Sequence, residues 1–176
     1  MTSSADLRVL FRAPAEIRRD GPWVSGDMGL ADARLAALLA AWPRSIPLVV
    51  EFQDPSWHVD ETFAALRAAG ATLCTTDLPV EGDEGAAAAA GTGGHSTAGA
   101  GASPDADPEP PFIRRTGSFL YLRLRRHDYD LAALDAWAAR IEPFLDAGDD
   151  VYVFFRHDPV GHAAELALDF AGRFNR

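Results

Sequence analysis

The 176-residue sequence contains a single cysteine, Cys74, so no internal disulfide can form. It also lacks any apolar run close to the roughly 18 residues that a membrane-spanning helix needs. Its first residues, MTSSADLRVLFRAP, do not follow the basic, apolar and small-residue order of a secretion signal. These absences predict a cytoplasmic protein in a reducing compartment, with no membrane partner. Cys74 lies in a short apolar run, which favours a small core residue over a nucleophile.

Basic charge is also scarce. The chain has 16 lysine and arginine residues against 26 aspartate and glutamate residues, and its formal net charge is -10. Such a surface argues against nonspecific binding to nucleic acids or anionic membranes, although Arg123, Arg125 and Arg126 could form a local basic site. No glycine-rich nucleotide loop follows a strand, and no Gly-x-Ser-x-Gly turn is present. His157, Asp158 and His162 form only a weak metal-binding pattern, so we predict neither a metal nor another cofactor.

The sequence does contain short apolar runs that alternate regularly with segments whose apolar residues recur at helical spacing. Strands are predicted at residues 7–11, 48–52, 71–76, 118–126 and 151–155. Leucine and aromatic residues at helical spacing follow four of them, with Asp32, Asp60 and Asp130 as predicted N-caps and Pro43, Gly70 and Gly148 as predicted ends. This alternation is typical of right-handed crossovers in a parallel sheet. The predicted fold class is therefore α/β, with about five parallel strands and flanking helices.

One segment interrupts the alternation. From Glu81 to Pro111 the chain consists almost entirely of Ala, Gly, Ser, Thr, Asp, Glu and Pro, with no aromatic residue. Such a composition cannot bury enough apolar area to offset the entropy lost on ordering. We therefore predict a disordered surface insertion at residues 81–111, within a single domain that spans residues 1–176.

Every predicted strand ends in polar or charged residues. These are Arg12; Glu51, Gln53 and Asp54; Asp77; Arg123, Arg125 and Arg126; and Arg156, His157 and Asp158. Because the carboxyl ends of parallel strands meet at one end of the fold, these side chains are expected to converge there. Glu51 is carried by an apolar strand and needs a cation, for which Arg123 on a neighbouring strand is the predicted partner. The cluster can be a ligand site or a structural ion-pair network, and the pattern leaves both open.

Four motifs resemble, in the right order, those of the YecE-like proteins (domain of unknown function 72). VVEFQDPSW at 49–57 is similar to their Glu-Phe-Arg-His-Pro-Ser-Trp signature, and TTDLP at 75–79 to the strand that follows it. YLRLRRHDYDLAALDAW at 121–137 and VYVFFRHDPVGHAAELALDF at 151–170 resemble their later strands and helices. The resemblance implies the C-terminal part of a TIM-type β/α barrel, with five strands where about eight are expected. The function of that family is not established, so the resemblance implies no particular reaction.

The resemblance also implies site residues. The family pattern is matched by Glu51, Ser56, Trp57, Asp77, Arg123 and Tyr129, whereas Gln53 and Asp54 replace the arginine and histidine of the signature. Among these residues and the other polar strand ends, we predict Glu51, Asp77 and His157 as catalytic groups. The predicted ligand-binding groups are Arg123, Arg125, Trp57 and Tyr129.

Two hypotheses about function follow. In the first, the strand C-termini form an enzyme-like pocket for a small polar or anionic ligand, with arginines providing charge and carboxylates and His157 moving protons. In the second, the chain is a truncated or degenerate, non-catalytic domain, or half of a split barrel that completes its sheet with another chain. Five strands cannot close such a barrel, so the strands at 7–11 and 151–155 would be open edges. This second hypothesis predicts self-association or a partner chain.

Overall fold

The computed structural model describes residues 8–21, 31–77, 112–156, 158 and 160–174. Five strands form one parallel sheet in the order β1-β2-β3-β4-β5, which confirms the predicted α/β class and the number of strands. The strands are β1 (Val9–Ala13), β2 (Leu48–Phe52), β3 (Thr72–Asp77), β4 (Phe119–Leu124) and β5 (Asp150–Phe155). Each lies within one or two residues of its expected bounds. The predicted insertion at 81–111 lies outside the described residues.

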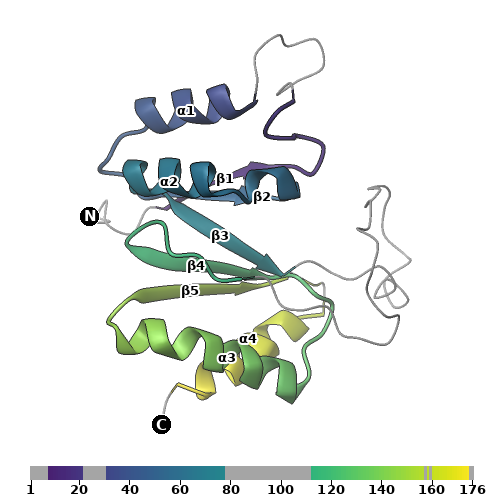
Figure 1. The fold of residues 1–176 in the computed structure, drawn as a ribbon. Coiled ribbons are helices and arrows are strands. Elements are labelled where there is room, and N and C mark those ends of the chain that lie inside the picture. Colours follow the sequence, from purple (N-terminus) through teal and green to yellow (C-terminus); the bar gives the residue numbers. More distant parts are fainter. Residues whose placement is uncertain (1–7, 22–30, 78–111, 157, 159, 175–176) are drawn as a thin grey trace, which may run out of the picture.

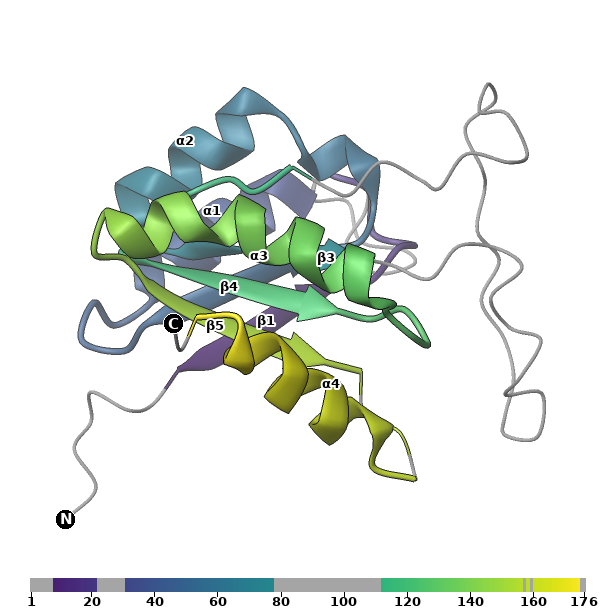
Figure 2. The ribbon, with the colours of Figure 1, turned by 90° about the horizontal axis from the view of Figure 1, so that it is seen from below.

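The helices all pack on one face of the sheet, here called the outer face. They are α1 (Ala31–Ala41), α2 (Asp60–Ala69), α3 (Leu131–Asp146) and α4 (His162–Gly172). Strand register places Val50 beside Leu73, and Leu122 beside Val153, on this face. Val50 and Leu73 share a core with α1 and α2, whereas Leu122 and Val153 share a core with α3 and α4. Figures 1 and 2 show the two helix pairs on opposite halves of the curved sheet.

The helix ends agree with the sequence in part. The Asp130 carboxylate accepts a hydrogen bond from the backbone N–H of Ala133 and caps α3, as predicted. Gly70 ends α2 with a φ of 66°, in the left-handed region where glycine is favoured. Asp60, in contrast, is the first residue of α2, with Val59 at the cap position. None of the helices that the structure describes is long and apolar enough to cross a membrane.

The opposite face, here called the inner face, is concave. Arg8, directly before β1, reaches across the sheet and lies over the rings of Phe119 in β4 and Tyr152 in β5, with its Cζ atom 5.3 Å and 4.0 Å from their centroids. Its guanidinium also donates a hydrogen bond to the Tyr152 hydroxyl. The two edge strands therefore face each other across a curved surface, which gives the architecture of a partial β/α barrel. No described helix covers this face, and Phe154 remains 46% exposed there.

Of the return segment that leads from β3 to β4, the structure describes residues 112–118, which form neither a helix nor a strand. In this segment the Thr116 hydroxyl accepts a hydrogen bond from the Leu73 N–H at 2.7 Å and donates one to the Ala71 carbonyl at 2.8 Å. Gly117 then passes against Thr72, the first residue of β3. An added Cβ at Gly117 would lie 2.2 Å from Thr72 Oγ1 and 3.1 Å from Thr72 Cα. Backbone packing therefore restricts this position to glycine.

This close approach predicts that Gly117→Ala destabilises the protein. The free energy of unfolding should fall by roughly 1–3 kcal/mol, because the new methyl group overpacks against backbone atoms as well as a side chain. Urea denaturation would measure the change. Gly172→Ala is the matched control, since a Cβ there meets no atom within 4 Å. Equal stabilities of the two variants would contradict the packing described at Gly117.

Candidate functional site

The centre of the candidate site is the carboxylate of Glu51, which is fully buried on β2. The Arg123 guanidinium forms a close ion pair with Glu51 Oε2, and Arg125 Nη1 lies 3.7 Å from Oε1. Gln53 Nε2 donates a long hydrogen bond of 3.4 Å to the same Oε1 atom. The predicted pairing of Glu51 with Arg123 is therefore confirmed. Strand alternation explains it, because residue 51 in β2 and residue 123 in β4 both face inward, and residues 53 and 125 directly after these strands continue the same alternation.

Arginines outnumber carboxylates at this end of the inner face. Arg12 on β1 lies directly opposite Glu51 in the strand register. Burial lowers the pKa of Arg125, and the positive charges of Arg123, Arg12 and Arg156 lower it further, while Glu51 opposes the shift. We call Arg12, Arg123, Arg125 and Arg156 the arginine cluster. Arg123 and Arg125 contact the buried Glu51 carboxylate, and Arg12 and Arg156 lie close enough to repel Arg125.

Sequence reasoning placed two members of this cluster, Arg12 and Arg156, among the converging strand ends but not among the predicted ligand-binding residues. Arg12 lies near the C-terminal end of the edge strand β1, and Arg156 directly follows the edge strand β5. This position at a strand C-terminus is the sequence feature that could have identified them. Their side chains extend from opposite edges of the sheet, and the curvature of the sheet brings both close to Arg125. Arg12 and Arg156 are exposed, whereas the side chains of Arg123 and Arg125 are 26% and 27% exposed.

Asp77 belongs to a separate cluster on the outer side of the sheet. Its Oδ2 atom lies 3.0 Å from Arg126 Nε and accepts a hydrogen bond of 3.0 Å from the Tyr129 hydroxyl. The Arg126 N–H in turn donates to that hydroxyl at 3.2 Å. Burial and the neighbouring Asp77 charge raise the pKa of Tyr129, so the phenol stays protonated and donates. Asp77 pairs in register with Leu124, whose side chain is in the outer core, so Asp77 and Glu51 face opposite sides.

Trp57 is fully buried beneath the end of β2. Its ring stacks on Phe52 with a centroid distance of 4.5 Å, and its indole N–H donates to the Ile17 carbonyl at 2.7 Å. The short 3-10 helix Pro55–Trp57 that positions it is capped by Asp54, whose Oδ1 atom accepts from the Ser56 N–H at 2.8 Å. In this arrangement Trp57 packs the core, and a ligand could reach its ring only by displacing it.

The third predicted catalytic residue, His157, lies outside the described residues. Its neighbour Asp158 accepts hydrogen bonds from the backbone N–H groups of Val160, His162 and Ala163 at the start of α4, and these bonds lower its pKa. His162 Nε2 lies 2.9 Å from Asp128 Oδ1, and this hydrogen bond raises the pKa of His162. These groups tie α4 to the loop after β4. Within the described ranges, no group of three His, Cys, Asp or Glu side chains could hold a metal ion.

Cys74 is buried on the inner face, within electrostatic range of the Glu51 carboxylate. Burial raises the pKa of its thiol to about 12, with the Glu51 charge acting in the same direction. The thiolate is the nucleophilic form of cysteine, so the protonated group packs instead with Val49 and Phe119. The interpretation of Cys74 as a core residue is therefore confirmed.

The burial of Glu51 predicts a large effect for Arg123→Ala. Removing the cation leaves a buried carboxylate without its nearest partner, which should reduce the free energy of unfolding by roughly 3–5 kcal/mol. Chemical denaturation of both proteins at neutral pH would measure it. The matched control is Arg18→Ala, which removes an exposed pair with Asp20 and should leave stability unchanged within error. A loss below about 1 kcal/mol for Arg123→Ala would contradict a dry, obligatory ion pair.

Comparisons with known proteins place the chain in a family. A DUF72 family protein from Thermotoga maritima MSB8 superimposes with a TM-score of 0.64 at 20% sequence identity, covering 96% of this chain and 58% of that one. A DUF72 family protein from Enterococcus faecalis V583 gives a TM-score of 0.61 at 17% identity, covering 96% and 60%. The chain thus spans less than two thirds of the length of these structures, and the likeness concerns the fold. No curated protein matches the sequence. The family model described as protein of unknown function DUF72 matches residues 23–176, so the chain belongs to the DUF72 family.

Proposed function

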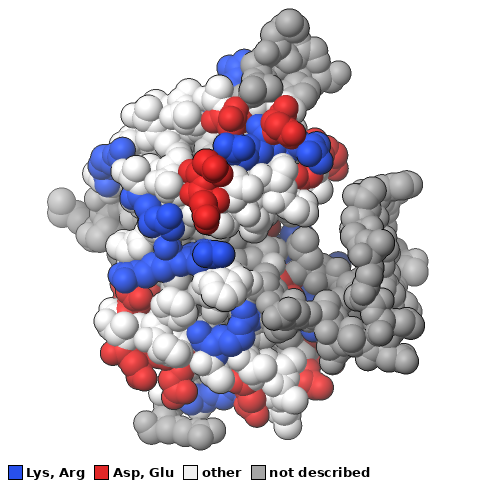
Figure 3. All heavy atoms as spheres, viewed as in Figure 1, with Lys and Arg blue, Asp and Glu red and all other residues white. Residues whose placement is uncertain are grey.

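We propose that the protein binds a small anionic ligand through the arginine cluster at the C-terminal ends of its strands. The observation that carries the proposal is the charge imbalance, since Arg123 and Arg125 share the single carboxylate of Glu51 while Arg12 and Arg156 lie close enough to repel Arg125. The chain as a whole carries a formal net charge of -10, and Figure 3 shows acidic groups alongside basic ones over one face of the molecule. The arginine cluster is therefore a locally positive region in a protein whose overall charge is negative.

The cluster suits phosphate or carboxylate oxygens in particular. Every one of the 16 basic residues in the sequence is an arginine. A guanidinium presents two parallel N–H donors to such groups, and its interaction strengthens where water is partly excluded. Arg123 and Arg125 are about three quarters buried, so part of their hydration is already lost. An anion would offset the mutual repulsion that lowers the pKa of Arg125.

Glu51 has a positioning role in this proposal. Its two oxygens hold Arg123 and Arg125, which fixes the direction of their remaining N–H groups. Both Glu51 oxygens are already in contact with these side chains and with Gln53, so binding is better supported than acid–base catalysis. The location agrees with the proposal, because parallel β/α folds build their sites at the carboxyl ends of the strands.

Titration with inorganic phosphate tests the proposal. Calorimetry or ¹H–¹⁵N NMR should detect binding that weakens with added salt, and Arg125→Gln should weaken it at least about fivefold, since a charge-assisted contact to phosphate is lost. Arg67→Gln is the matched control, because Arg67 is an exposed arginine on α2, away from the strand ends. Phosphate affinity that is absent, or equal in Arg125→Gln and Arg67→Gln, would contradict the proposal.

A second candidate function is assembly with another polypeptide that adds parallel strands to the sheet. It is favoured by the two sheet edges, since β1 and β5 each have one neighbour among the described strands. Leu10 and Phe154 are 37% and 46% exposed on the inner face near these edges. Open, apolar edges favour pairing with another chain. The greater length of the DUF72 structures is consistent with a sheet that continues beyond these strands.

This second candidate predicts that the purified 176-residue chain is not a stable monomer. Sedimentation velocity at micromolar concentration should show species larger than 18.9 kDa. Phe154→Lys should shift them toward the monomer, because charge on an edge strand opposes pairing. Leu168→Lys is the control, since Leu168 is 74% exposed on α4, on the outer side. A clean monomer with one cooperative unfolding transition would contradict this function.

A further inference from the structure

A cavity opens where β2 and β3 separate. The two strands pair in register only at Val49 with Thr72 and at Val50 with Leu73, whereas β3 and β4 pair at four positions and β4 and β5 at six. Beyond Val50 the two strands diverge, and a cavity of about 330 Å³ lies between their C-terminal halves and the return segment before β4. This volume is at the lower end of the roughly 300–1,000 Å³ typical of small-molecule sites.

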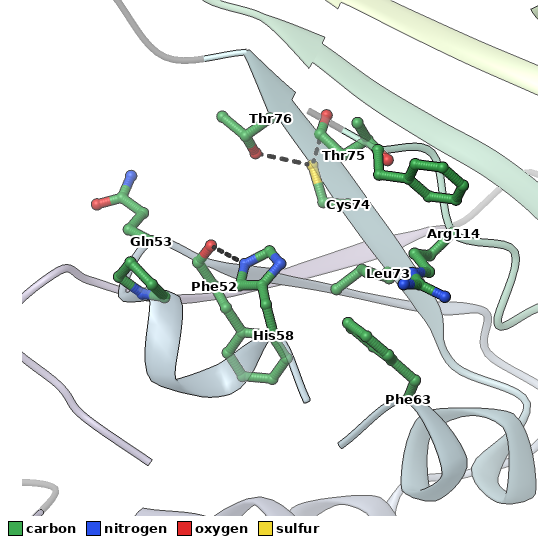
Figure 4. A pocket seen from close by; sticks show the side chains of 11 residues that line it. Phe52, Gln53, His58, Phe63, Leu73, Cys74, Thr75, Thr76 and Arg114 are labelled. Carbon is green, nitrogen blue, oxygen red and sulfur yellow. Dashed lines mark hydrogen bonds between the residues drawn. The ribbon is translucent and has the colours of Figure 1, made fainter. Parts of the chain in front are cut away.

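The lining of the cavity combines aromatic rings with positive charge. The Arg114 guanidinium lies over the ring of Phe63, 5.2 Å from its centroid, and over that of Phe112 at 4.9 Å. His58 lies across from β3, beside Phe63, and its Nε2 atom is 3.3 Å from the Phe52 carbonyl oxygen (Figure 4). At the other end, Gln53 and Thr76 provide uncharged polar groups. None of the 11 residues that line the cavity is acidic.

We propose that this cavity binds a planar aromatic carboxylate, with its ring against Phe63 and Phe112 and its carboxylate on Arg114. The aromatic side chains favour a flat apolar ring through offset or edge contacts. Arg114 has no acidic neighbour within the lining, so a ligand anion would supply its counter-charge, and a guanidinium between rings is well placed to form a bidentate pair. A small inorganic anion would leave the aromatic wall exposed to water, and a neutral hydrocarbon would leave Arg114 without a partner.

The cavity is distinct from the arginine cluster. No member of that cluster lines it, and Arg114 lies against Phe63 of α2, a helix on the outer face. The two regions meet at Gln53, which lines the cavity and also donates to the Glu51 carboxylate. Occupation of one site does not require the other, so the two proposals can succeed or fail separately.

The probe for the test is 2-naphthoate, with the neutral 2-naphthalenemethanol as its matched analogue. Calorimetry on the full chain should detect binding of 2-naphthoate, with the alcohol at least about tenfold weaker because it cannot pair with a guanidinium. Arg114→Gln should weaken naphthoate binding by about tenfold or more, and Phe112→Ser should also weaken it. Phe112 is 76% exposed and Arg114 is also exposed, so both variants should keep the fold, which circular dichroism would check.

Two control variants make the outcome decisive. Arg67→Gln removes an exposed arginine outside the cavity and should leave naphthoate affinity unchanged. Arg125→Gln should also leave it unchanged, because Arg125 belongs to the arginine cluster. Absence of naphthoate binding, or equal affinities for the acid and the alcohol, would overturn the proposal. A loss caused by Arg125→Gln and not by Arg114→Gln would also overturn it, because the probe would then occupy the other site.

Discussion

The burial of one carboxylate, that of Glu51, determines how the charged side chains are arranged at the C-terminal ends of the strands. A carboxylate with no exposure to water needs cations and hydrogen-bond donors within reach, because burying it without them is strongly unfavourable. That requirement fixes Arg123 and Arg125 on the inner face of β4 and draws Gln53 toward the same oxygen. Since two arginines already exceed the charge of Glu51, the approach of Arg12 and Arg156 adds a surplus that no described carboxylate at the inner face balances.

One-sided coverage of the sheet explains why polar chemistry gathers on the inner face. The helices cover the outer face with two apolar clusters, and on that face Asp77 forms a short network with Arg126 and Tyr129. The inner face has a base of aromatic rings around Arg8 and a rim of arginines. The same curvature that exposes Phe154 brings Arg12 and Arg156 into one electrostatic environment.

The sequence predicted the elements and the central ion pair well, because both depend on local pattern and on strand alternation. Strand bounds, the Asp130 cap and the Glu51–Arg123 pair all follow from residues within a few positions of one another or from parity along a strand. The separation of Asp77 from Glu51 follows from that same parity and was missed, because residue type was weighed before side-chain direction. The cavity between β2 and β3 was not predicted, because its lining includes Phe112 and Arg114, which are distant in sequence from both strands.

The contact of Arg8 with Tyr152 has a consequence for how the chain folds. Strand order follows chain order, so every ladder joins strands that are neighbours in sequence, and each closes the shortest loop available to it. Arg8 and Tyr152 are instead 144 residues apart, across the whole sheet. Closing so long a loop is entropically unfavourable until the intervening strands have assembled. We therefore expect the contact of Arg8 with the Tyr152 ring to form late in folding, after the pairs of adjacent strands, which do not depend on it.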